Sequence, residues 1–187
     1  MPRTSVKESL NALQNATSIS VFKENSDEFI STDQELFLQK LLSLASNDKV
    51  SIEHELVQKI KDSGVNFDTA LENITNLYEL ELLAEYFFDK LDKSAFLVKL
   101  TSQHADFSGN QEFVALKQKL IKKFVNAGAD IAAALGVTIG LKNLQLLSQF
   151  LYKIDKKAFL TKVLATQTNT YAVPEFYHAF MAANHLG

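Results

Sequence analysis

The nine residues DKSAFLVKL (92–100) occur a second time, with three substitutions, as DKKAFLTKV at 155–163. Part of the same pattern appears further upstream as FLQKL at 37–41. The three copies of the Phe-Leu-x-Lys motif are separated by 59 and 63 residues. Self-similarity at such spacings indicates structural units that stack and bury their faces on one another.

The similarity extends well beyond this motif. Residues 56–100 align with 120–163 when Asp89 is left unmatched, and 16 of the 44 aligned pairs are identical. Unrelated chains of ordinary composition agree at only about 7% of positions. We therefore expect a double repeat of about 64 residues.

Apolar spacing and helix-end signals predict that each repeat is built from helices. Apolar residues follow the 3.6-residue period of an amphipathic helix, as at Leu147, Phe150, Leu151 and Ile154. Asp92, Asp130 and Asp155 stand where helix N-caps are expected, and Thr32 to Glu35 has the form of a capping box. Gly64 and Gly128 are placed to end helices. No convincing period-2 pattern indicates a strand.

Composition agrees with long helical segments in one domain or one short array. The 187 residues include only 6 Gly and 2 Pro, and 47% of them are hydrophobic. There is no cysteine, which excludes disulfides and thiolate metal sites. We expect an all-α protein.

Two segments resemble the outer helix and Gly-Ala-Asp turn of ankyrin repeats. These are ELVQKIKDSGVN (55–66) and KLIKKFVNAGADI (119–131). The stretch from Phe67 to Phe88 resembles a following unit, with Thr69 and Leu71 where the family's Thr-Pro-Leu-His motif begins, although its Pro and His are missing. The resemblance covers roughly residues 34–187.

The resemblance implies an ankyrin-like solenoid of stacked antiparallel helix pairs. Another αα-solenoid and a closed helical bundle remain alternatives. We assign residues 1–33 to an N-terminal helical or irregular cap and residues 34–187 to the repeat array. The expected units lie near 34–66, 67–93, 94–130, 131–156 and 157–187.

Ankyrin-like proteins generally recognise other proteins, so the resemblance implies a non-catalytic interaction module or adaptor that binds a protein partner. Charge supports an alternative. Residues 1–92 carry a net charge of −9 and residues 93–187 a net charge of +6. Such polarity favours head-to-tail self-assembly as a structural protein. A helical enzyme or ligand binder with an unrecognised pocket is the further alternative.

The expected partner-binding residues are basic and aromatic. Lys153, Lys156 and Lys157 lie near a predicted turn, and Lys93 occupies the position of Lys156 in the first copy. In the C-terminal segment, Tyr171, Phe176 and Tyr177 could anchor another chain or close the stack.

Nucleic-acid binding is not expected. The cluster Lys117, Lys119, Lys122 and Lys123 is the densest basic stretch, and we expect its last three members on an outer helix surface. However, the sequence pI is about 5.8 and the only arginine is Arg3.

No catalytic or metal-binding constellation stands out, and we expect no cofactor and no enzymatic activity. Glu175 and His178 form a single Glu-x-x-His, whereas di-metal helical sites use two such motifs. The first twenty residues lack the apolar core of a signal peptide, and the longest nearly apolar run, 131–141, is too short to span a bilayer. We expect a soluble intracellular protein of the cytoplasm.

Overall fold

The computed structural model describes residues 5–103 and 110–166. Within these ranges the chain forms twelve α-helices and two short 3-10 helices and contains no strand, which confirms the all-α prediction. The helices are α1 (Val6–Asn15), α2 (Ile19–Glu24), α3 (Ser26–Thr32), α4 (Gln34–Asp48), α5 (His54–Ser63), α6 (Phe67–Asn73), α7 (Leu77–Tyr86), η1 (Phe88–Lys90), α8 (Lys93–Ser102), α9 (Gln111–Asn126), α10 (Ile131–Val137), α11 (Leu141–Ser148), η2 (Leu151–Lys153) and α12 (Lys156–Thr166).

The three predicted aspartate caps are confirmed. The side chain of Asp92 accepts the N–H of Ala95 at 2.8 Å, and Asp155 accepts that of Ala158 at the same distance. Asp130 accepts two N–H groups, from Ala132 and Ala133. Each carboxylate satisfies donors that the first turn of a helix leaves without an intrahelical partner.

The predicted capping box at Thr32 is wrong by one residue. Thr32 ends α3, and its hydroxyl donates to the Glu28 carbonyl rather than capping α4. Asp33 is the N-cap of α4 and accepts the N–H of Leu36 at 2.9 Å. Asp33 caps α4 in place of Thr32 because it is the one residue with an extended backbone between α3 and α4.

Gly64 and Gly128 end helices as expected. Gly64 caps α5 with φ +86°, and Gly128 follows α9 with φ +91°. A side chain is strained at such angles, so glycine stops both helices without strain.

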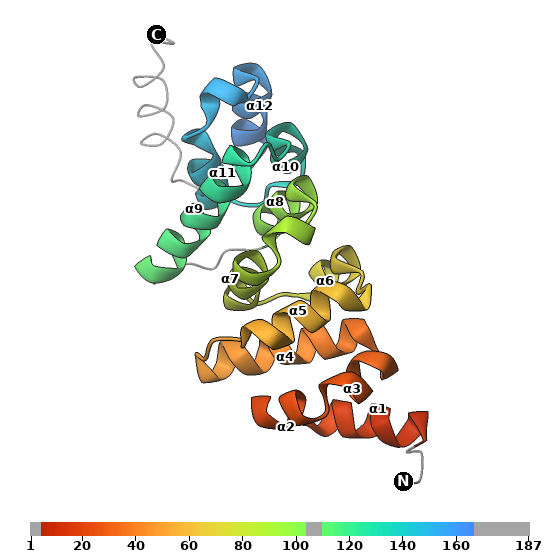
Figure 1. Ribbon diagram of the computed structural model, residues 1–187. Coiled ribbons are helices and arrows are strands. Elements are labelled where there is room, and N and C mark those ends of the chain that lie inside the picture. Colours follow the sequence, from red (N-terminus) through yellow and green to blue (C-terminus); the bar gives the residue numbers. More distant parts are fainter. Residues whose placement is uncertain (1–4, 104–109, 167–187) are drawn as a thin grey trace.

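Helices that are close in the chain are close in space (Figure 1). The main contacts of α4 are with α1, α2 and α3 before it and with α5, α6 and α7 after it. Helix α8 packs on α6, α9 and α10, and α12 packs on α10 and α11. In Figure 1 the helices succeed one another from the N-terminal to the C-terminal end of an elongated body.

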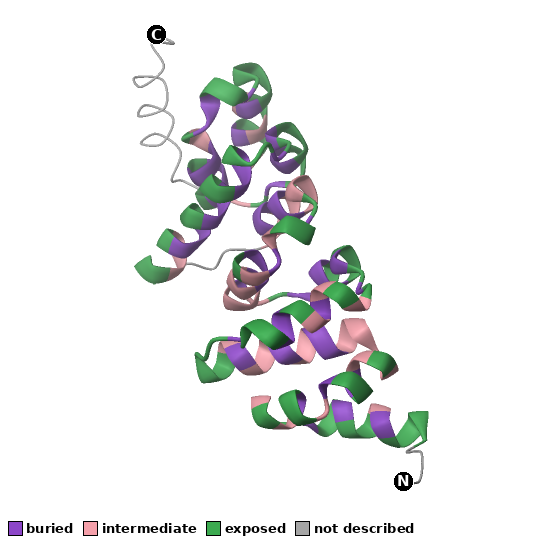
Figure 2. Ribbon diagram, viewed as in Figure 1, coloured by how far each residue is buried: buried purple, intermediate pink, exposed green. Residues whose placement is uncertain are grey.

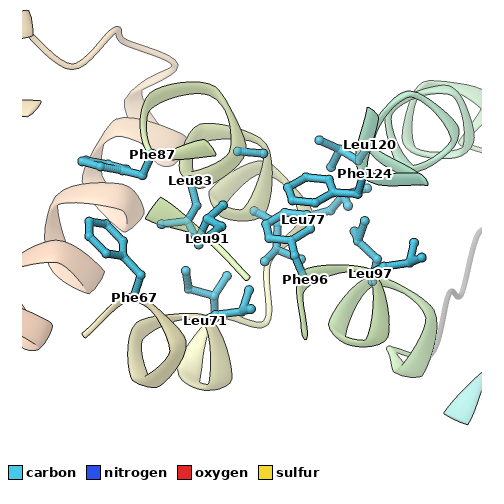
Figure 3. Packing of buried hydrophobic residues seen from close by; sticks show 14 of the residues in the cluster. Phe67, Leu71, Leu77, Leu83, Phe87, Leu91, Phe96, Leu97, Leu120 and Phe124 are labelled. Carbon is cyan, nitrogen blue, oxygen red and sulfur yellow. The ribbon is translucent and has the colours of Figure 1, made fainter. Parts of the chain in front are cut away.

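Buried apolar residues form one cluster that runs along this body (Figure 2). Phenylalanines occupy several of the contacts between successive helices. The rings of Phe67 and Phe87 lie 5.2 Å apart, and those of Phe96 and Phe124 stack at 3.9 Å (Figure 3). Because both members of the second pair are fully buried, this contact joins α8 firmly to α9.

Helix bounds follow the spacing of the sequence alignment. Helices α6 and α10 each have seven residues and begin 64 positions apart, and α7 and α11 also begin 64 positions apart. The starts of η1 and η2, and those of α8 and α12, differ by 63. The change from 64 to 63 falls between the starts of α7 and η1, just before Asp89, the unmatched residue of the alignment. The N-terminal region assigned to a cap holds three helices, α1 to α3.

Candidate functional site

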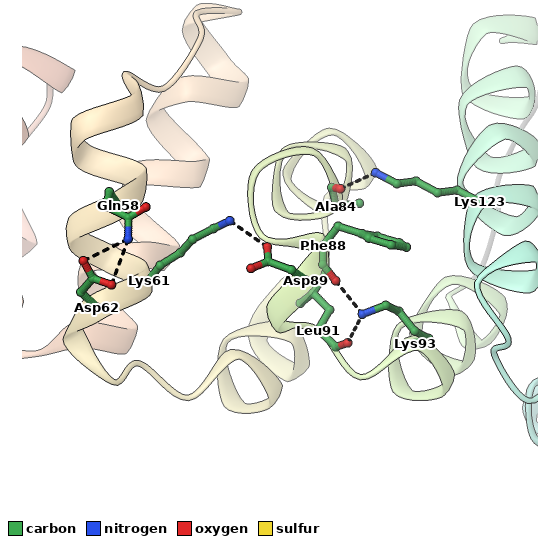
Figure 4. Close-up of polar contacts among 9 residues, drawn as sticks. All are labelled: Gln58, Lys61, Asp62, Ala84, Phe88, Asp89, Leu91, Lys93 and Lys123. Carbon is green, nitrogen blue, oxygen red and sulfur yellow. Dashed lines mark hydrogen bonds and ion pairs between the residues drawn. The ribbon is translucent and has the colours of Figure 1, made fainter.

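Lys93, a predicted partner-binding residue, holds together the turn before its own helix. Its ammonium group donates to the carbonyl oxygens of Phe88 and Leu91, both at 2.6 Å (Figure 4). The same group lies 4.6 Å from the centroid of the Phe88 ring. These contacts give Lys93 a structural role between η1 and α8 that sequence reasoning missed.

A second lysine approaches Phe88 from α9. Lys123 donates to the Ala84 carbonyl at 2.6 Å, and its Nζ lies 4.5 Å from the Phe88 ring centroid (Figure 4). Burial lowers the pKa of Lys123, Lys119 lowers it further, and Glu85 opposes the shift. Lys123 therefore joins α9 to α7 while one side of the residue stays exposed.

Ion pairs at the surface also connect helices that are not consecutive in the chain. Lys119 on α9 lies 2.9 Å from Glu81 on α7, and Lys61 on α5 lies 2.7 Å from Asp89 on η1. Such pairs contribute about 0–1 kcal/mol each because water and salt screen them. They add little to stability, but each pair identifies two helix faces that lie against each other.

One recurring contact was not expected from the sequence. The lysine of each Phe-Leu-x-Lys motif donates to a carbonyl of an earlier helix. Lys40 bonds to Gln14, Lys99 to Glu72 and Lys162 to Gly136. Each acceptor is the second-last residue of its helix, α1, α6 or α10. A lysine at a helix C-terminus is favourable because the last carbonyls lack intrahelical donors. The repeated Phe-Leu-x-Lys motif identifies the three lysines in the sequence. It does not identify their acceptors, because the three acceptor residues are of different types.

Of the remaining lysines predicted to bind a partner, Lys153 forms a hydrogen bond within the chain and the other two lie at the surface. Lys153 donates to the Val125 carbonyl at 3.2 Å, which links η2 to α9. Lys156 and Lys157 occupy the exposed first turn of α12. The predicted anchors Tyr171, Phe176 and Tyr177 lie outside the described residues.

Two open grooves of about 530 Å³ each lie between helices at opposite ends of the described chain. The first, between α3 and α5, is lined by three carboxylates, Asp27, Glu55 and Asp62, and by Lys59. Lys59 is paired with Asp27 at 2.8 Å. The second groove lies between α10 and α12. Its charged lining residues are Asp155, Lys157 and Lys162. Small residues such as Ala132, Gly136 and Ala158 line the rest.

Lys117 is the buried basic group of the described chain. Only 2% of its surface is exposed, and burial lowers its pKa to about 8. Lys117 belongs to the basic cluster but was not among the three members expected at the surface, and it lies on the buried side of α9. Lys119, Lys122 and Lys123 are exposed, as expected. A buried amine can act as a nucleophile, but neither groove is lined by Lys117.

Within residues 5–103 and 110–166, no three His, Cys, Asp or Glu side chains are grouped so as to hold a metal ion. His54 begins α5 and is exposed. His178 and Glu175, the one Glu-x-x-His pair, lie outside the described residues. No helix of the described chain is long and apolar enough to cross a bilayer.

Comparison with known proteins found no matching family model, no matching curated protein and no matching solved structure.

Proposed function

We propose that this chain is a non-catalytic protein-binding module whose helices stack as an ankyrin-like αα-solenoid. The carrying observation is the pattern of packing, in which each helix makes its main contacts with helices nearby in the chain. A chain built in this way leaves an extended surface beside its core, and such surfaces serve to bind other proteins.

Repeated polar contacts support the stacked arrangement. The N–H of Asn66, the N-cap of α6, donates to the Glu35 carboxylate at 3.0 Å. The N–H of Asp130, the N-cap of α10, donates to the Ser94 hydroxyl at 2.9 Å. Because Glu35 and Ser94 both stand two residues after an N-cap aspartate, the two junctions are built in the same way.

The surface at the C-terminal end of the described chain is the best candidate for partner contact. Lys156 and Lys157 are exposed there, whereas Lys93 and Lys153 bond to carbonyls of the chain. Helix α12 contains three lysines and no acidic residue. A partner with an acidic surface would therefore be favoured at this end.

The proposal is tested by capturing partners on the immobilised full chain. A charge-reversed variant, Lys156→Glu with Lys157→Glu, is compared with wild type and with a control, Lys7→Glu with Lys122→Glu. The control lysines are also exposed but lie on α1 and α9. We expect wild type and control to retain the same protein saturably and the α12 variant to lose it. Retention by no variant, together with thermal stabilisation by a small molecule, would overturn the proposal.

A second candidate function is head-to-tail self-assembly, favoured by the opposite charge of the two grooves. Carboxylates outnumber the single lysine in the groove near the N-terminus, whereas two lysines outnumber the single carboxylate, Asp155, in the groove near the C-terminus. Solution mass by light scattering at low and at high salt tests it. Assembly through these grooves predicts oligomers that dissociate as salt screens the charges, whereas a binding module stays monomeric under both conditions.

A further inference from the structure

One face of α12 is more exposed than the same face of the two earlier copies. Lys157, Ala158, Thr161 and Leu164 are exposed, with 55% of Leu164 accessible. Their counterparts on α8 and on α4 are all buried or half-buried. On α8 these are Ser94, Ala95, Val98 and Thr101, and on α4 they are Glu35, Leu36, Gln39 and Leu42. Leu42 and Thr101, the counterparts of Leu164, are 0% exposed.

In the earlier copies this face is covered by a helix of the next unit. Helix α6 packs on α4, and α10 packs on α8. The covering helix begins at the first of the four positions, where Glu35 and Ser94 accept the N–H of its N-cap. Helix α10 passes the last position of α8 with a small residue, since the Thr101 hydroxyl donates to the carbonyl of Ala134 at 3.3 Å.

The two covering helices carry the same small residue at the same position. Ala70 and Ala134 each lie four residues after the N-cap, and both are 0% exposed. A small side chain there permits the two helices to approach closely. The molecule thus contains two examples of the helix that such a face accepts.

We propose that the exposed face of α12 binds an amphipathic helix of another protein, in the place that α6 takes on α4 and α10 takes on α8. The inference rests on the proposed function as a protein-binding module and adds the chemistry of the partner.

The residues of α12 that differ from the earlier copies define that chemistry. Lys157 stands where Glu35 and Ser94 accept an N–H, and a lysine ammonium can only donate. A carboxylate in the first turn of the bound helix would satisfy Lys157 and would also be favoured by the positive end of that helix. Leu164 requires a small residue four positions after the partner's N-cap. The partner is therefore a helix with an acidic first turn and an alanine-like residue at that position.

The probe is a 20-residue peptide in which residues 65–74 of this chain, VNFDTALENI, are followed by a neutral Ala/Gln-rich helical tail. It contains Asp68 in the first turn of the helix and Ala70 at the crossing position. A basic counterpart carries Asp68→Lys and Glu72→Lys, and a bulky counterpart carries Ala70→Leu. Fluorescence anisotropy of each labelled peptide is measured against the full chain.

We expect the acidic peptide to bind wild type and to lose affinity about tenfold on Lys157→Glu, which should in turn bind the basic peptide better than wild type does. Leu164→Asp and the bulky peptide should each abolish detectable binding. Val6→Asp, an exposed apolar residue on α1, is the matched control and should bind as wild type does. Equal affinity for all variants, or no binding to wild type, would overturn the inference.

Two other occupants are tested on the same face. Because the chain has no cysteine, Leu164→Cys and Val6→Cys each provide a single thiol. An open face predicts labelling rates of Leu164→Cys and Val6→Cys that agree within about threefold and do not depend on protein concentration. Slow labelling of Leu164→Cys at every concentration would assign the face to the chain's own remaining residues. Slow labelling only at high concentration would assign it to a second copy, and either result overturns the proposal.

Failure of this inference can be distinguished from failure of the proposed function. If the peptides do not bind but the full chain still captures a partner that Lys156→Glu with Lys157→Glu loses, the module binds by a different mode. If neither peptide nor partner is bound, both proposals fall.

Discussion

At the scale of single residues, lysines connect helices of this molecule more often than they face only water. Lys40, Lys99 and Lys162 close helix ends, and Lys93 and Lys123 approach the two sides of one aromatic ring. The charge of these residues can be read from the sequence. Their acceptors are backbone carbonyls, which every residue has, so no sequence pattern identifies them.

Lys117 makes stability depend on pH in alkaline solution. Its pKa is about 8 in the folded chain and near 10.5 when unfolded. The unfolded state therefore holds more protons between these values, so stability rises with pH from about 8 to 10.5 and is lowered by a constant amount below that window. A shift of this size corresponds to roughly 3 kcal/mol. Lys117→Met should lack this rise in urea unfolding measured from pH 7 to 10.5.

The control for this prediction is Lys122→Met, an exposed lysine on the same helix. It should follow the wild-type pH profile. Parallel profiles for Lys117→Met and wild type would show that Lys117 titrates normally in the folded chain.

Glu79 has the opposite effect in acid. Burial raises its pKa above the ordinary 4.5, and a hydrogen bond from Ser43 offsets part of the shift. The folded state holds more protons in this window, so stability falls as pH rises from 4.5 through the pKa of the folded state. We expect Glu79→Gln, which can still accept from Ser43, to raise the melting temperature relative to wild type at pH 7 but not at pH 3. The reverse order would contradict the assigned shift. The aligned residue in the second copy is already an amide, Asn143, whose side-chain nitrogen lies within hydrogen-bond distance of three carbonyl oxygens.

At the scale of helices, the cap of α8 has a definite contribution to stability. The Asp92 carboxylate accepts the N–H of Ala95 at the start of a helix that packs on α6, α9 and α10. Asp92→Ala should lower the free energy of unfolding by about 1 kcal/mol, and Asp92→Asn, which keeps an acceptor, by much less. Urea denaturation measures both. Equal losses for the two variants would mean that the charge, rather than the cap bond, supplies the stability.

Helix starts and stops were the part of the fold that sequence predicts best, because a cap is a local event. An aspartate at Asp92, Asp130 or Asp155 bonds to residues two or three positions away, and the glycine at Gly64 needs no distant partner. The N-terminal region was less predictable, since α2 and α3 have only six and seven residues. Only the positive charge of the candidate site was predicted from the sequence. Sequence indicated the α12 lysines, but not that the equivalent faces of α4 and α8 are covered by α6 and α10.

At the scale of the whole molecule, packing between near neighbours limits how far a local change can spread. Val163 on α12 is 2% exposed and Leu13 on α1 is 0% exposed, but α12 packs mainly on α10 and α11, whereas α1 packs on α3 and α4. For the stacked array that we propose, stability is approximately a sum of unit and interface terms, so we expect the two ends to open separately.

Val163→Ala should therefore accelerate amide hydrogen exchange in α10 to α12 and leave α1 to α4 unchanged, and Leu13→Ala should do the reverse. Loss of buried methyl groups costs roughly 1–4 kcal/mol, enough to change local exchange rates at least several-fold. Exchange resolved by mass spectrometry of peptides measures both variants under native conditions. A single cooperative unit would instead show each substitution raising exchange in the slowest amides of both ends by the same factor. That result would place the chain with closed helical bundles, because only a shared core transmits the loss of Val163 to α1.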